Sequence, residues 1–359
     1  MGQLVRTSRG IVVGETIQRL PSPHPATYIG KGKISEIVAE RDRAGYTMVV
    51  LDDEISPTQQ RNLENALEVK VLDRTALILD IFAMRARSRE GQLQVDLAQS
   101  EYLLPRLAGQ WSHLERLGGS GAQGSIGMRG PGETQLETDR RLVRNKIGRL
   151  KRDLERVRKQ RALHRRRRAR SGTPVVALVG YTNAGKSTLM RALTQADVLV
   201  EDRLFATLDP VTRRVRLPGG STTLLTDTVG FIQKLPTQLV AAFRATLEEL
   251  NEADLLLHVV DISRPSAAQE SQTVDDTLAS LGLEEKPRVM AFNKTDLIVR
   301  QDGHPLQSLD EIEEDEIALA EHWPAAALIS AARGWGLTEL LERVEGALGR
   351  SALRPVLHA

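Results

Sequence analysis

The stretch Gly180–Thr188, GYTNAGKST, follows the apolar run Val175–Val179 and precedes the helical pattern Leu189–Leu193. It fits the phosphate-loop pattern G-x-x-x-x-G-K-[ST], with the strand before it and the helix after it that the pattern requires. Glycines let the backbone curl so that successive N–H groups point toward phosphate oxygens, and the start of the helix adds partial positive charge. The alternative, a glycine turn beside an exposed lysine, leaves the flanking strand and helix unexplained. The stretch therefore predicts an α/β fold that binds a nucleoside triphosphate.

Two residues of this stretch have the chemistry that a triphosphate needs. Lys186 is placed to reach the β- and γ-phosphates, and the hydroxyl of Ser187 is placed to bind Mg²⁺. We therefore expect a nucleoside triphosphate, with Mg²⁺, as the ligand. The expected contacts are Gly180, Tyr181, Thr182, Asn183, Ala184, Gly185, Lys186, Ser187 and Thr188.

Length and composition exclude several classes of protein. With 359 residues the chain is long enough for two or more domains with separate cores. It has no cysteine, which excludes disulfides, a thiolate nucleophile and cysteine-based zinc sites and fits the cytoplasm. It shows no signal-peptide core and no apolar run of about 18 residues. We therefore expect a cytoplasmic protein with no membrane span.

The formal net charge of +2 conceals one strongly basic segment. Between Arg140 and Arg170 there are sixteen lysines or arginines, against only Asp153 and Glu155. Such a run is often no more than a solvated face. Its density here favours contact with a polyanion such as RNA.

Residues 1–90 alternate short apolar runs with helical patterns, which predicts a small α/β domain. Ser56 before Pro57 is expected to cap a helix. Asp52, Asp53 and Glu54 follow a strand and are either ligand contacts or a solvated loop. The GKGK at Gly30–Lys33 is expected to be a basic turn, because no buried strand precedes it. The expected elements are Gly10–Val13, Ile34–Arg43, Thr47–Leu51, Pro57–Leu67 and Lys70–Leu72.

Residues 91–171 are predicted to form an antiparallel helical hairpin. The helical pattern starts near Gln92, and Pro105 should end or kink that helix. The glycine-rich loop Gly118–Gly132 follows and is expected to be mobile until a partner binds it. A second apolar seam then begins, and it is too short to demand a dimer, so we expect a monomer. The seam residues are Val143, Ile147, Leu150, Leu154 and Val157.

Residues 172–349 are predicted to be a P-loop NTPase domain, α/β, with a doubly wound and mostly parallel sheet. Several short strands there end in polar residues, which is typical of the ligand face of such a sheet. Asp227 is placed to join a Mg²⁺ shell, and the Gly230 N–H to meet a γ-phosphate. Leu224–Thr226 leads into DTVG (Asp227–Gly230), Val289–Phe292 into NKTD (Asn293–Asp296), and Ala326–Ile329 into Ser330 and Ala331.

In this order GYTNAGKS, DTVG, NKTD and SA resemble the G1, G3, G4 and G5 motifs of translation-factor-class GTPases. The resemblance implies that Asp296 accepts hydrogen bonds from guanine N1–H and N2–H, while the Ala331 N–H meets O6. Adenine lacks that donor pair, which argues against an ATP kinase or a transporter ATPase. The implied contacts in these motifs are Asp227, Thr228, Val229, Gly230, Asn293, Lys294, Asp296, Ser330, Ala331 and Ala332.

The segment Arg203–Pro210 contains the expected switch I. Thr207 is expected to bind Mg²⁺ through its hydroxyl and the γ-phosphate through its N–H in the GTP state, with Phe205 and Ala206 beside the nucleotide. The expected metal ligands are thus Ser187, Thr207 and Asp227, and the expected catalytic groups are Lys186, Thr207 and Gly230.

Phe231 follows Gly230, where the Ras-like pattern places a glutamine that orients the attacking water. An apolar side chain cannot orient water, so we expect intrinsic hydrolysis at or below about 10⁻³ per second and a partner that supplies order or charge. The alternative is another polar residue, such as Gln233. Faster unstimulated turnover in Phe231→Gln would support this account.

The chain from about Pro25 to Leu348 resembles the HflX family of ribosome-associated GTPases. The resemblance implies binding to the large ribosomal subunit, contact of the helical arm and glycine-rich loop with rRNA, and splitting of stalled ribosomes. The first strand and helix of that family are expected to be missing, and residues 350–359 to be a short tail. The resemblance rests on Asp73–Thr75, Leu79–Phe82, Arg85–Arg87, Leu93–Ala98, Arg129–Arg141, Phe205–Pro210 and Asp227–Phe231.

Two other functions stay open. The chain could be an RNA-binding or ribosome-assembly module that holds GTP as a structural ligand, and its RNA binding would then survive substitution of Lys186 or Ser187. It could also be a membrane-surface GTPase that uses Arg161–Arg170 on anionic lipid, although that run lacks an adjacent apolar stripe. An RNA contact through the arm would weaken steeply with salt, and a flat salt profile would exclude it.

Overall fold

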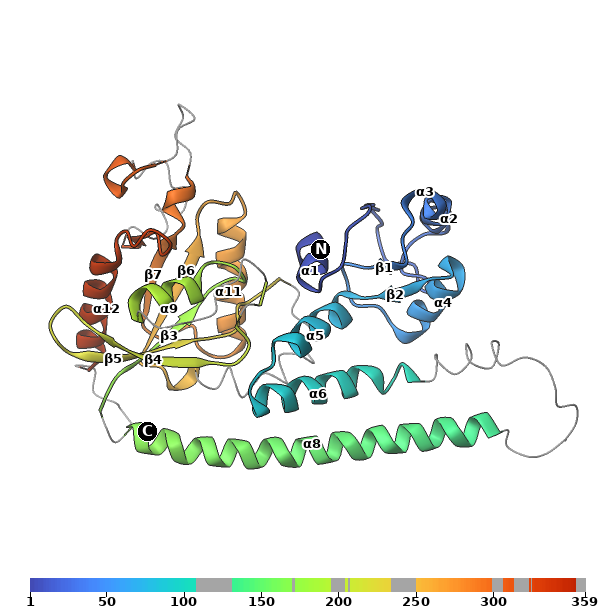
Figure 1. Ribbon diagram of the computed structural model, residues 1–359, viewed down its shortest axis with the longest axis horizontal. Coiled ribbons are helices and arrows are strands. Elements are labelled where there is room, and N and C mark those ends of the chain that lie inside the picture. Colours follow the sequence, from blue (N-terminus) through green and yellow to red (C-terminus); the bar gives the residue numbers. More distant parts are fainter. Residues whose placement is uncertain are drawn as a thin grey trace, which may run out of the picture. The chain divides into compact units, whose positions relative to one another are not determined.

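The computed structural model describes residues 1–107, 131–169, 172–194, 204–205, 207–233, 250–298, 306–312, 323 and 325–352 (Figure 1). The chain divides into two compact units, the first covering Met1–Arg158 and the second most of the chain from Lys159 onward. The domain boundaries at 90/91, 171/172 and 349/350 stay predictions. The glycine-rich loop lies outside the described residues, except for Pro131 and Gly132.

The first unit contains a two-stranded parallel sheet formed by β1 (Met48–Val50) and β2 (Lys70–Leu72). The connecting helix α4 (Pro57–Leu67) begins where the sequence predicted. The Ser56 Oγ accepts the Gln59 N–H at 3.2 Å, and the Gln59 Oε1 accepts the Ser56 N–H at 2.9 Å. This reciprocal capping satisfies two backbone donors at the helix start. The strand–helix–strand order of this domain is therefore confirmed.

Two predictions for the first residues were wrong. Gly10–Val13 is not a strand, and the Ile11 side chain is 86% exposed, because a short apolar run becomes a strand only where neighbours cover it. The chain instead starts with α1 (Gly2–Thr7). Gly30–Lys33 is not a turn but the start of α2 (Lys31–Ala39), where Lys33 pairs with Glu36 at helical spacing; α3 (Arg41–Ala44) follows.

The acids after β1 contact groups of the same unit. Asp52 forms an ion pair with Arg74, the first residue of α5 (Arg74–Arg85). Asp53 accepts a hydrogen bond from Tyr28, and burial, together with this bond, raises the pKa of Tyr28 to about 12. A role of these acids as ligand contacts stays a prediction.

A buried polar cluster holds the first unit together. Asp73, 0% exposed, accepts hydrogen bonds from Ala76 N at 2.8 Å, Tyr102 Oη at 2.9 Å and Arg106 Nη2 at 3.0 Å. The Arg106 guanidinium also donates to Ile55 O at 2.7 Å and lies 3.6 Å from the centre of the Tyr102 ring. Each buried charge thus has partners, as stability in a dry interior requires.

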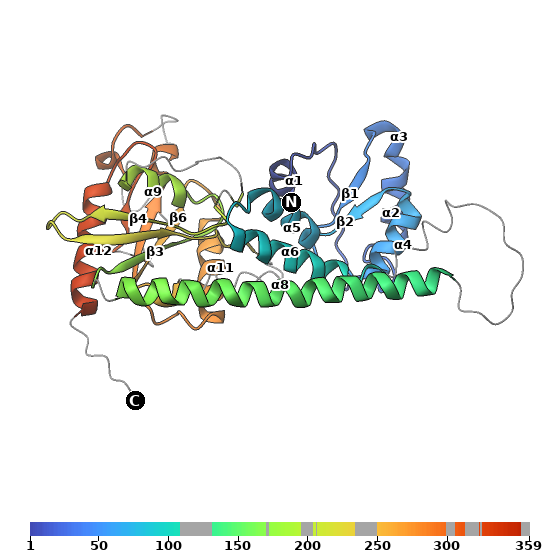
Figure 2. The same ribbon diagram turned by 60° about the horizontal axis from the view of Figure 1, so that its bottom comes forward.

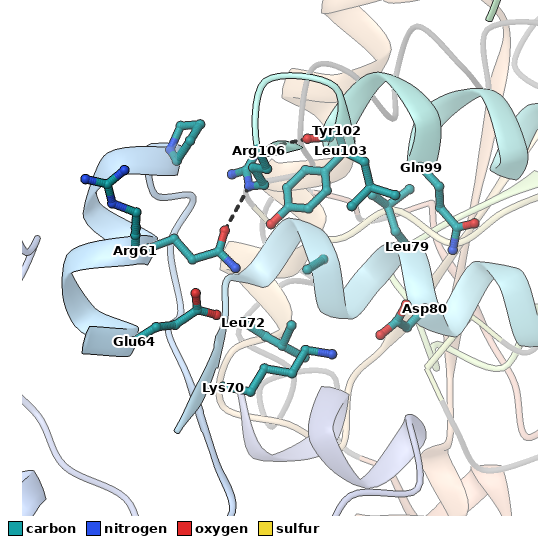
Figure 3. A pocket seen from close by; sticks show the side chains of 13 residues that line it. Arg61, Glu64, Lys70, Leu72, Leu79, Asp80, Gln99, Tyr102, Leu103 and Arg106 are labelled. Carbon is teal, nitrogen blue, oxygen red and sulfur yellow. Dashed lines mark hydrogen bonds between the residues drawn. The ribbon is translucent and has the colours of Figure 1, made fainter. Parts of the chain in front are cut away.

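A pocket of about 280 Å³ lies beside this cluster, between α4, β2, α5 and α6 (Arg89–Leu103). Figure 3 shows Leu79 and Tyr102 on its wall and the charged groups of Lys70 and Asp80 near one another. Burial raises the pKa of Asp80, and Lys70 opposes this shift.

The predicted helical hairpin is present. Helix α6 ends two residues before Pro105 and runs beside α8 (Pro131–Ala169) in the opposite direction, as the colours in Figures 1 and 2 show. Leu97 packs with Leu150 and Leu154, and an ion pair joins Lys151 to Glu101 at 2.8 Å. The basic run Arg165–Arg168 falls in the last turns of α8, and its side chains lie outside the described residues.

The second unit is organised by a six-stranded sheet with the strand order β4-β5-β3-β6-β7-β8. All neighbours are parallel except β4 and β5, which form an antiparallel hairpin. The predicted doubly wound, mostly parallel sheet is therefore confirmed. Its elements are β3 (Val175–Val179), α9 (Lys186–Thr194), β4 (Val211–Arg216), β5 (Thr222–Asp227), β6 (Leu255–Asp261), α11 (Ala267–Ser280), β7 (Arg288–Asn293), η1 (Thr295–Leu297), η2 (Leu309–Glu311), β8 (Ala327–Leu328) and α12 (Leu337–Ala352).

Helices cover both faces of this sheet. Leu257 of β6 packs in one cluster with Met190 of α9 and Val344 of α12, whereas Val260 packs on the other face with Ala267 of α11. Both faces are buried, which explains why β3 and β6 are almost continuously apolar. Within the described ranges, no helix has the length and apolar character needed to cross a membrane.

Candidate nucleotide-binding site

The phosphate loop turns from β3 into α9 at the place that the sequence predicted. Gly180 and Gly185 have φ values of 151° and 100°, which side-chain-bearing residues rarely adopt. A Cβ at Gly180 would lie 2.3 Å from Val259 O, and one at Gly185 would lie 2.2 Å from Asn293 Nδ2. Close contacts with β6 and β7 therefore require glycine at both positions.

Lys186 lies inside the curl of this loop, 6% exposed. Its Nζ donates to Gly180 O and to Tyr181 O, both at 3.0 Å. Burial lowers the pKa of Lys186 to about 8, and the nearby Asp227 opposes this shift. The ammonium is thus held by main-chain carbonyls at the centre of a loop whose shape suits phosphate oxygens.

Three side-chain oxygens from distant parts of the chain meet next to Lys186. The Ser187 and Thr207 hydroxyls lie 2.7 Å apart, and they donate to Asp227 Oδ2 at 2.7 and 2.8 Å. Asp227 is 0% exposed, its Oδ1 lacks a hydrogen-bond partner among the described residues, and burial raises its pKa. A buried carboxylate oxygen without a partner costs free energy unless a ligand uses it. This hard oxygen set could hold Mg²⁺.

The DTVG segment, extended by Phe231, lies against the phosphate loop. Phe231 N donates to Gly180 O at 3.1 Å, and Thr182 N donates to Phe231 O at 2.7 Å. A Cβ at Gly230 would lie 2.9 Å from the main-chain Cα of Thr182, so only a residue without a side chain fits there. Phe231 itself is 3% exposed. Its ring is therefore covered, and it contacts the loop through its main chain.

The expected base-binding motifs are also adjacent. Asn293 links them to the phosphate loop, because its Nδ2 donates to Ala184 O at 2.8 Å and its Oδ1 accepts Ala331 N at 3.0 Å. Ser330 Oγ donates to Asp296 Oδ1 at 2.6 Å. The NKTD and SA segments thus form one surface that continues from the phosphate loop.

The other predicted site residues are placed less directly. Thr228 is buried and donates to Leu178 O at 2.6 Å, so its hydroxyl serves the sheet. Phe205 is 2% exposed with φ 55°, and Val229 is 8% exposed, so neither side chain is open to a ligand. Ala206 lies outside the described residues. Exposed Ala332 and half-buried Thr188 flank the site.

Asp261 is the residue near the site that the sequence reasoning missed. It ends β6, is 2% exposed, and its Oδ2 lies 2.8 Å from Lys294 Nζ. The signal was present, because LLLHVVD, like the strand before DTVG, is an apolar run that ends in an aspartate.

Family profiles described as "GTP-binding GTPase N-terminal", "GTP-binding GTPase Middle Region" and "50S ribosome-binding GTPase" match residues 1–83, 85–168 and 175–294. GTPase HflX of Caldanaerobacter subterraneus subsp. tengcongensis is 52% identical over 296 residues, covering 82% of this chain and 68% of that protein. The chain belongs to the HflX family of GTPases. It is therefore an enzyme that binds and hydrolyses GTP, as the motifs predicted.

Further HflX relatives share most of the chain. GTPase HflX of Escherichia coli (strain K12) is 46% identical over 337 residues, covering 93% of this chain and 75% of that protein. Among solved structures, "crystal structure of SsGBP and GDP complex" is similar at 23% identity and a TM-score of 0.49, covering 98% of this chain and 95% of that one. The latter likeness is too distant to carry an argument about this chain.

Proposed function

We propose that this HflX-family GTPase binds the large ribosomal subunit in the cytoplasm and splits or rescues stalled ribosomes, which in turn stimulate its GTP hydrolysis. The observation that carries the proposal is Phe231. At the position where a glutamine would orient water, it offers a buried ring and a main chain that is bonded to the phosphate loop. A partner that reorders this segment would complete the active site. The match of residues 175–294 to ribosome-binding GTPases supports the ribosome as that partner.

In this proposal the phosphate side of the site works through residues already in place. Lys186 leaves the carbonyls of Gly180 and Tyr181 to neutralise the β- and γ-phosphates, and the N–H groups of Thr207 and Gly230 meet the γ-phosphate. Ser187, Thr207 and Asp227 would hold Mg²⁺, which when bound would neutralise phosphate charge. The Oδ1 of Asp227, with which no described residue pairs, supports this donor set.

Base selection is assigned to the NKTD and SA segments. Asp296 accepts the guanine N1–H and N2–H donors, and the Ala331 N–H turns from Asn293 Oδ1, its acceptor in this structure, to guanine O6. The Ser330–Asp296 hydrogen bond supports this role, because it orients the carboxylate before the base arrives.

Helix α8 is the basic arm that contacts rRNA in this proposal. The protein acts as a monomer. Along its described turns Arg141, Arg144, Arg149 and Arg152 are exposed, and α8 contacts α6 through its opposite, apolar seam. Exposed arginines at helical spacing suit a phosphate backbone.

The first test is the GTP turnover rate with and without purified ribosomes or large subunits. Stimulation of tenfold or more, lost in Lys186→Ala and absent with ATP, supports the proposal. Light scattering of intact ribosomes under the same conditions tests splitting. Measurable GTP binding without stimulation by ribosomes would contradict it.

The second candidate is an RNA-binding assembly module with GTP as a structural ligand, which the exposed arginines of α8 also favour. It predicts that Ser187→Ala leaves binding to rRNA unchanged. The ribosome-acting GTPase instead predicts that the nucleotide state controls binding. Filter binding at several salt concentrations separates these outcomes, since an arm contact weakens steeply with salt.

A further inference from the structure

Strand β6 ends in a buried carboxylate that none of the nucleotide motifs contains. Asp261 Oδ1 accepts hydrogen bonds from Ser263 N at 3.1 Å and Ser263 Oγ at 2.6 Å. Its Oδ2 lies 2.8 Å from Lys294 Nζ and 3.3 Å from Arg264 Nε. Both carboxylate oxygens thus have partners, and the hydroxyl and amide of Ser263 fix the orientation of the group.

The ion pair with Lys294 bends that side chain back toward β6. Asp261 and Asn293 are paired residues on the parallel strands β6 and β7, so Asp261 lies beside the residue that precedes Lys294. Lys294 has φ 66°, a conformation that a lysine keeps only where its surroundings enforce it. The side chain is therefore held at both ends, by its backbone conformation and by the ion pair of its ammonium.

The two cations on Asp261 are not equivalent. Arg264 Nη1 also lies 3.7 Å from Glu270 Oε1, so Arg264 keeps an acidic neighbour without Asp261. In the part of the chain that the structure describes, Asp261 is the one acidic group within ion-pair distance of Lys294. Loss of the Asp261 carboxylate would therefore leave Lys294 without an ion-pair partner among the described residues, with Glu270 as a more distant acidic neighbour.

The position of Lys294 makes this restraint matter for the nucleotide. It lies two residues before Asp296, whose carboxylate is held by Ser330. A planar base bound at Asp296 needs hydrocarbon against its face, and Lys294 offers a four-carbon stem. A free lysine loses substantial side-chain entropy when a ligand orders it, and its ammonium would repel the donor edge of the base. A stem that is ordered beforehand avoids both costs.

We propose that Asp261 is a positioning residue for guanine recognition, which acts by holding Lys294 in its binding conformation before the nucleotide arrives. The inference rests on the proposed function, because it places the base at Asp296. It adds to the base site a residue outside the four nucleotide motifs.

The test is calorimetric binding of GDP and ADP to the full chain carrying Asp261→Asn, Lys294→Met or both changes. Each single change is expected to raise the Kd for GDP about tenfold, because one side chain must then be ordered on binding, and to lower the preference for GDP over ADP. The double variant is expected to bind GDP no more weakly than Lys294→Met. Asp261→Glu, which keeps the charge, is expected to restore part of the affinity.

The matched control is Asp275→Asn, which breaks an ion pair with Arg288 in the same unit and away from the predicted base contacts. It is expected to leave the Kd for GDP unchanged. Wild-type affinity in Asp261→Asn, or additive losses in the double variant, would overturn the inference. If Asp261→Asn does not fold, the Kd values of Lys294→Met and Asp261→Glu for GDP test the inference instead. Wild-type affinity in both variants would overturn the inference. If Asp296→Asn leaves GDP binding unchanged, the proposed base site itself is wrong.

Discussion

Each unit of the molecule contains a fully buried aspartate, Asp73 in the first and Asp227 in the second. Asp73 accepts from an amide, a phenol and a guanidinium that belong to its own unit. Asp227 accepts hydrogen bonds from two hydroxyls at one oxygen, whereas no described residue pairs with the other, and burial raises its pKa. A satisfied carboxylate stabilises the fold, whereas an unsatisfied one lowers stability and is kept where a ligand uses it.

The largest expected effect on this comparison comes from Asp73→Ala. It leaves the Arg106 guanidinium buried without its counter-charge, which should lower the free energy of unfolding by about 3–5 kcal/mol. Urea denaturation measures this loss. Glu101→Ala, which breaks the more exposed ion pair with Lys151, should cost less than about 1 kcal/mol. Equal losses of the free energy of unfolding in both variants would show that the buried Asp73 stabilises the fold no more than an exposed ion pair does.

Asp227→Asn should affect GTP turnover strongly and the stability of the fold little, which is the opposite of Asp73→Ala. GTP turnover in the presence of ribosomes is expected to fall about 10²–10³-fold, because a carboxylate that would hold the phosphate-neutralising Mg²⁺ is lost. The free energy of unfolding should change by less than about 1 kcal/mol or rise, since a desolvated charge is removed. Turnover and urea denaturation are measured on the same sample. A large loss of stability would show that Asp227 is as structural as Asp73.

His258 extends the comparison to a base. It is 0% exposed, neither ring nitrogen has a hydrogen-bond partner in the part of the chain that the structure describes, and burial, with Arg288 and Lys186, lowers its pKa to about 3. Below about pH 6.5 the unfolded chain therefore binds a proton that the folded chain does not, so stability falls by up to about 1.4 kcal/mol per pH unit. In His258→Leu this contribution to the pH dependence of the free energy of unfolding should be absent. Denaturation at pH 7 and pH 5 tests it, and an unchanged slope would refute it.

Ser56→Ala is the mildest test, because it removes a satisfied polar contact that carries no charge. Loss of the α4 cap should lower the free energy of unfolding by about 1 kcal/mol. Ser35→Ala, inside α2, removes a hydroxyl that bonds only within the helix and should have little effect. Thermal unfolding compares the two variants. A larger effect from Ser35 would argue against the cap.

The sequence predicted best what local chemistry determines. Phosphate and base contacts need fixed residue types at fixed spacings, so the phosphate loop and the DTVG and NKTD segments lie where they were expected. Gly10–Val13 failed because an apolar run carries no information about what covers it. The bonds of Asp73 to Tyr102 and Arg106 span 29 and 33 residues, and no local pattern encodes them. Asp261 was missed because it contacts the NKTD motif through Lys294 without belonging to that motif.

The contact between Gly185 and Asn293 has a consequence for how such a site changes over generations. Asn293 bonds a carbonyl 109 residues earlier in the chain, in space that a side chain at Gly185 would fill. A substitution that reshapes the base pocket at Asn293 must therefore be matched by a change in the phosphate loop, because Asn293 packs against Gly185 and bonds to Ala184 O. The phosphate-loop and NKTD motifs are therefore expected to change together in evolution. A mutant library that seeks altered nucleotide preference must diversify both loops together.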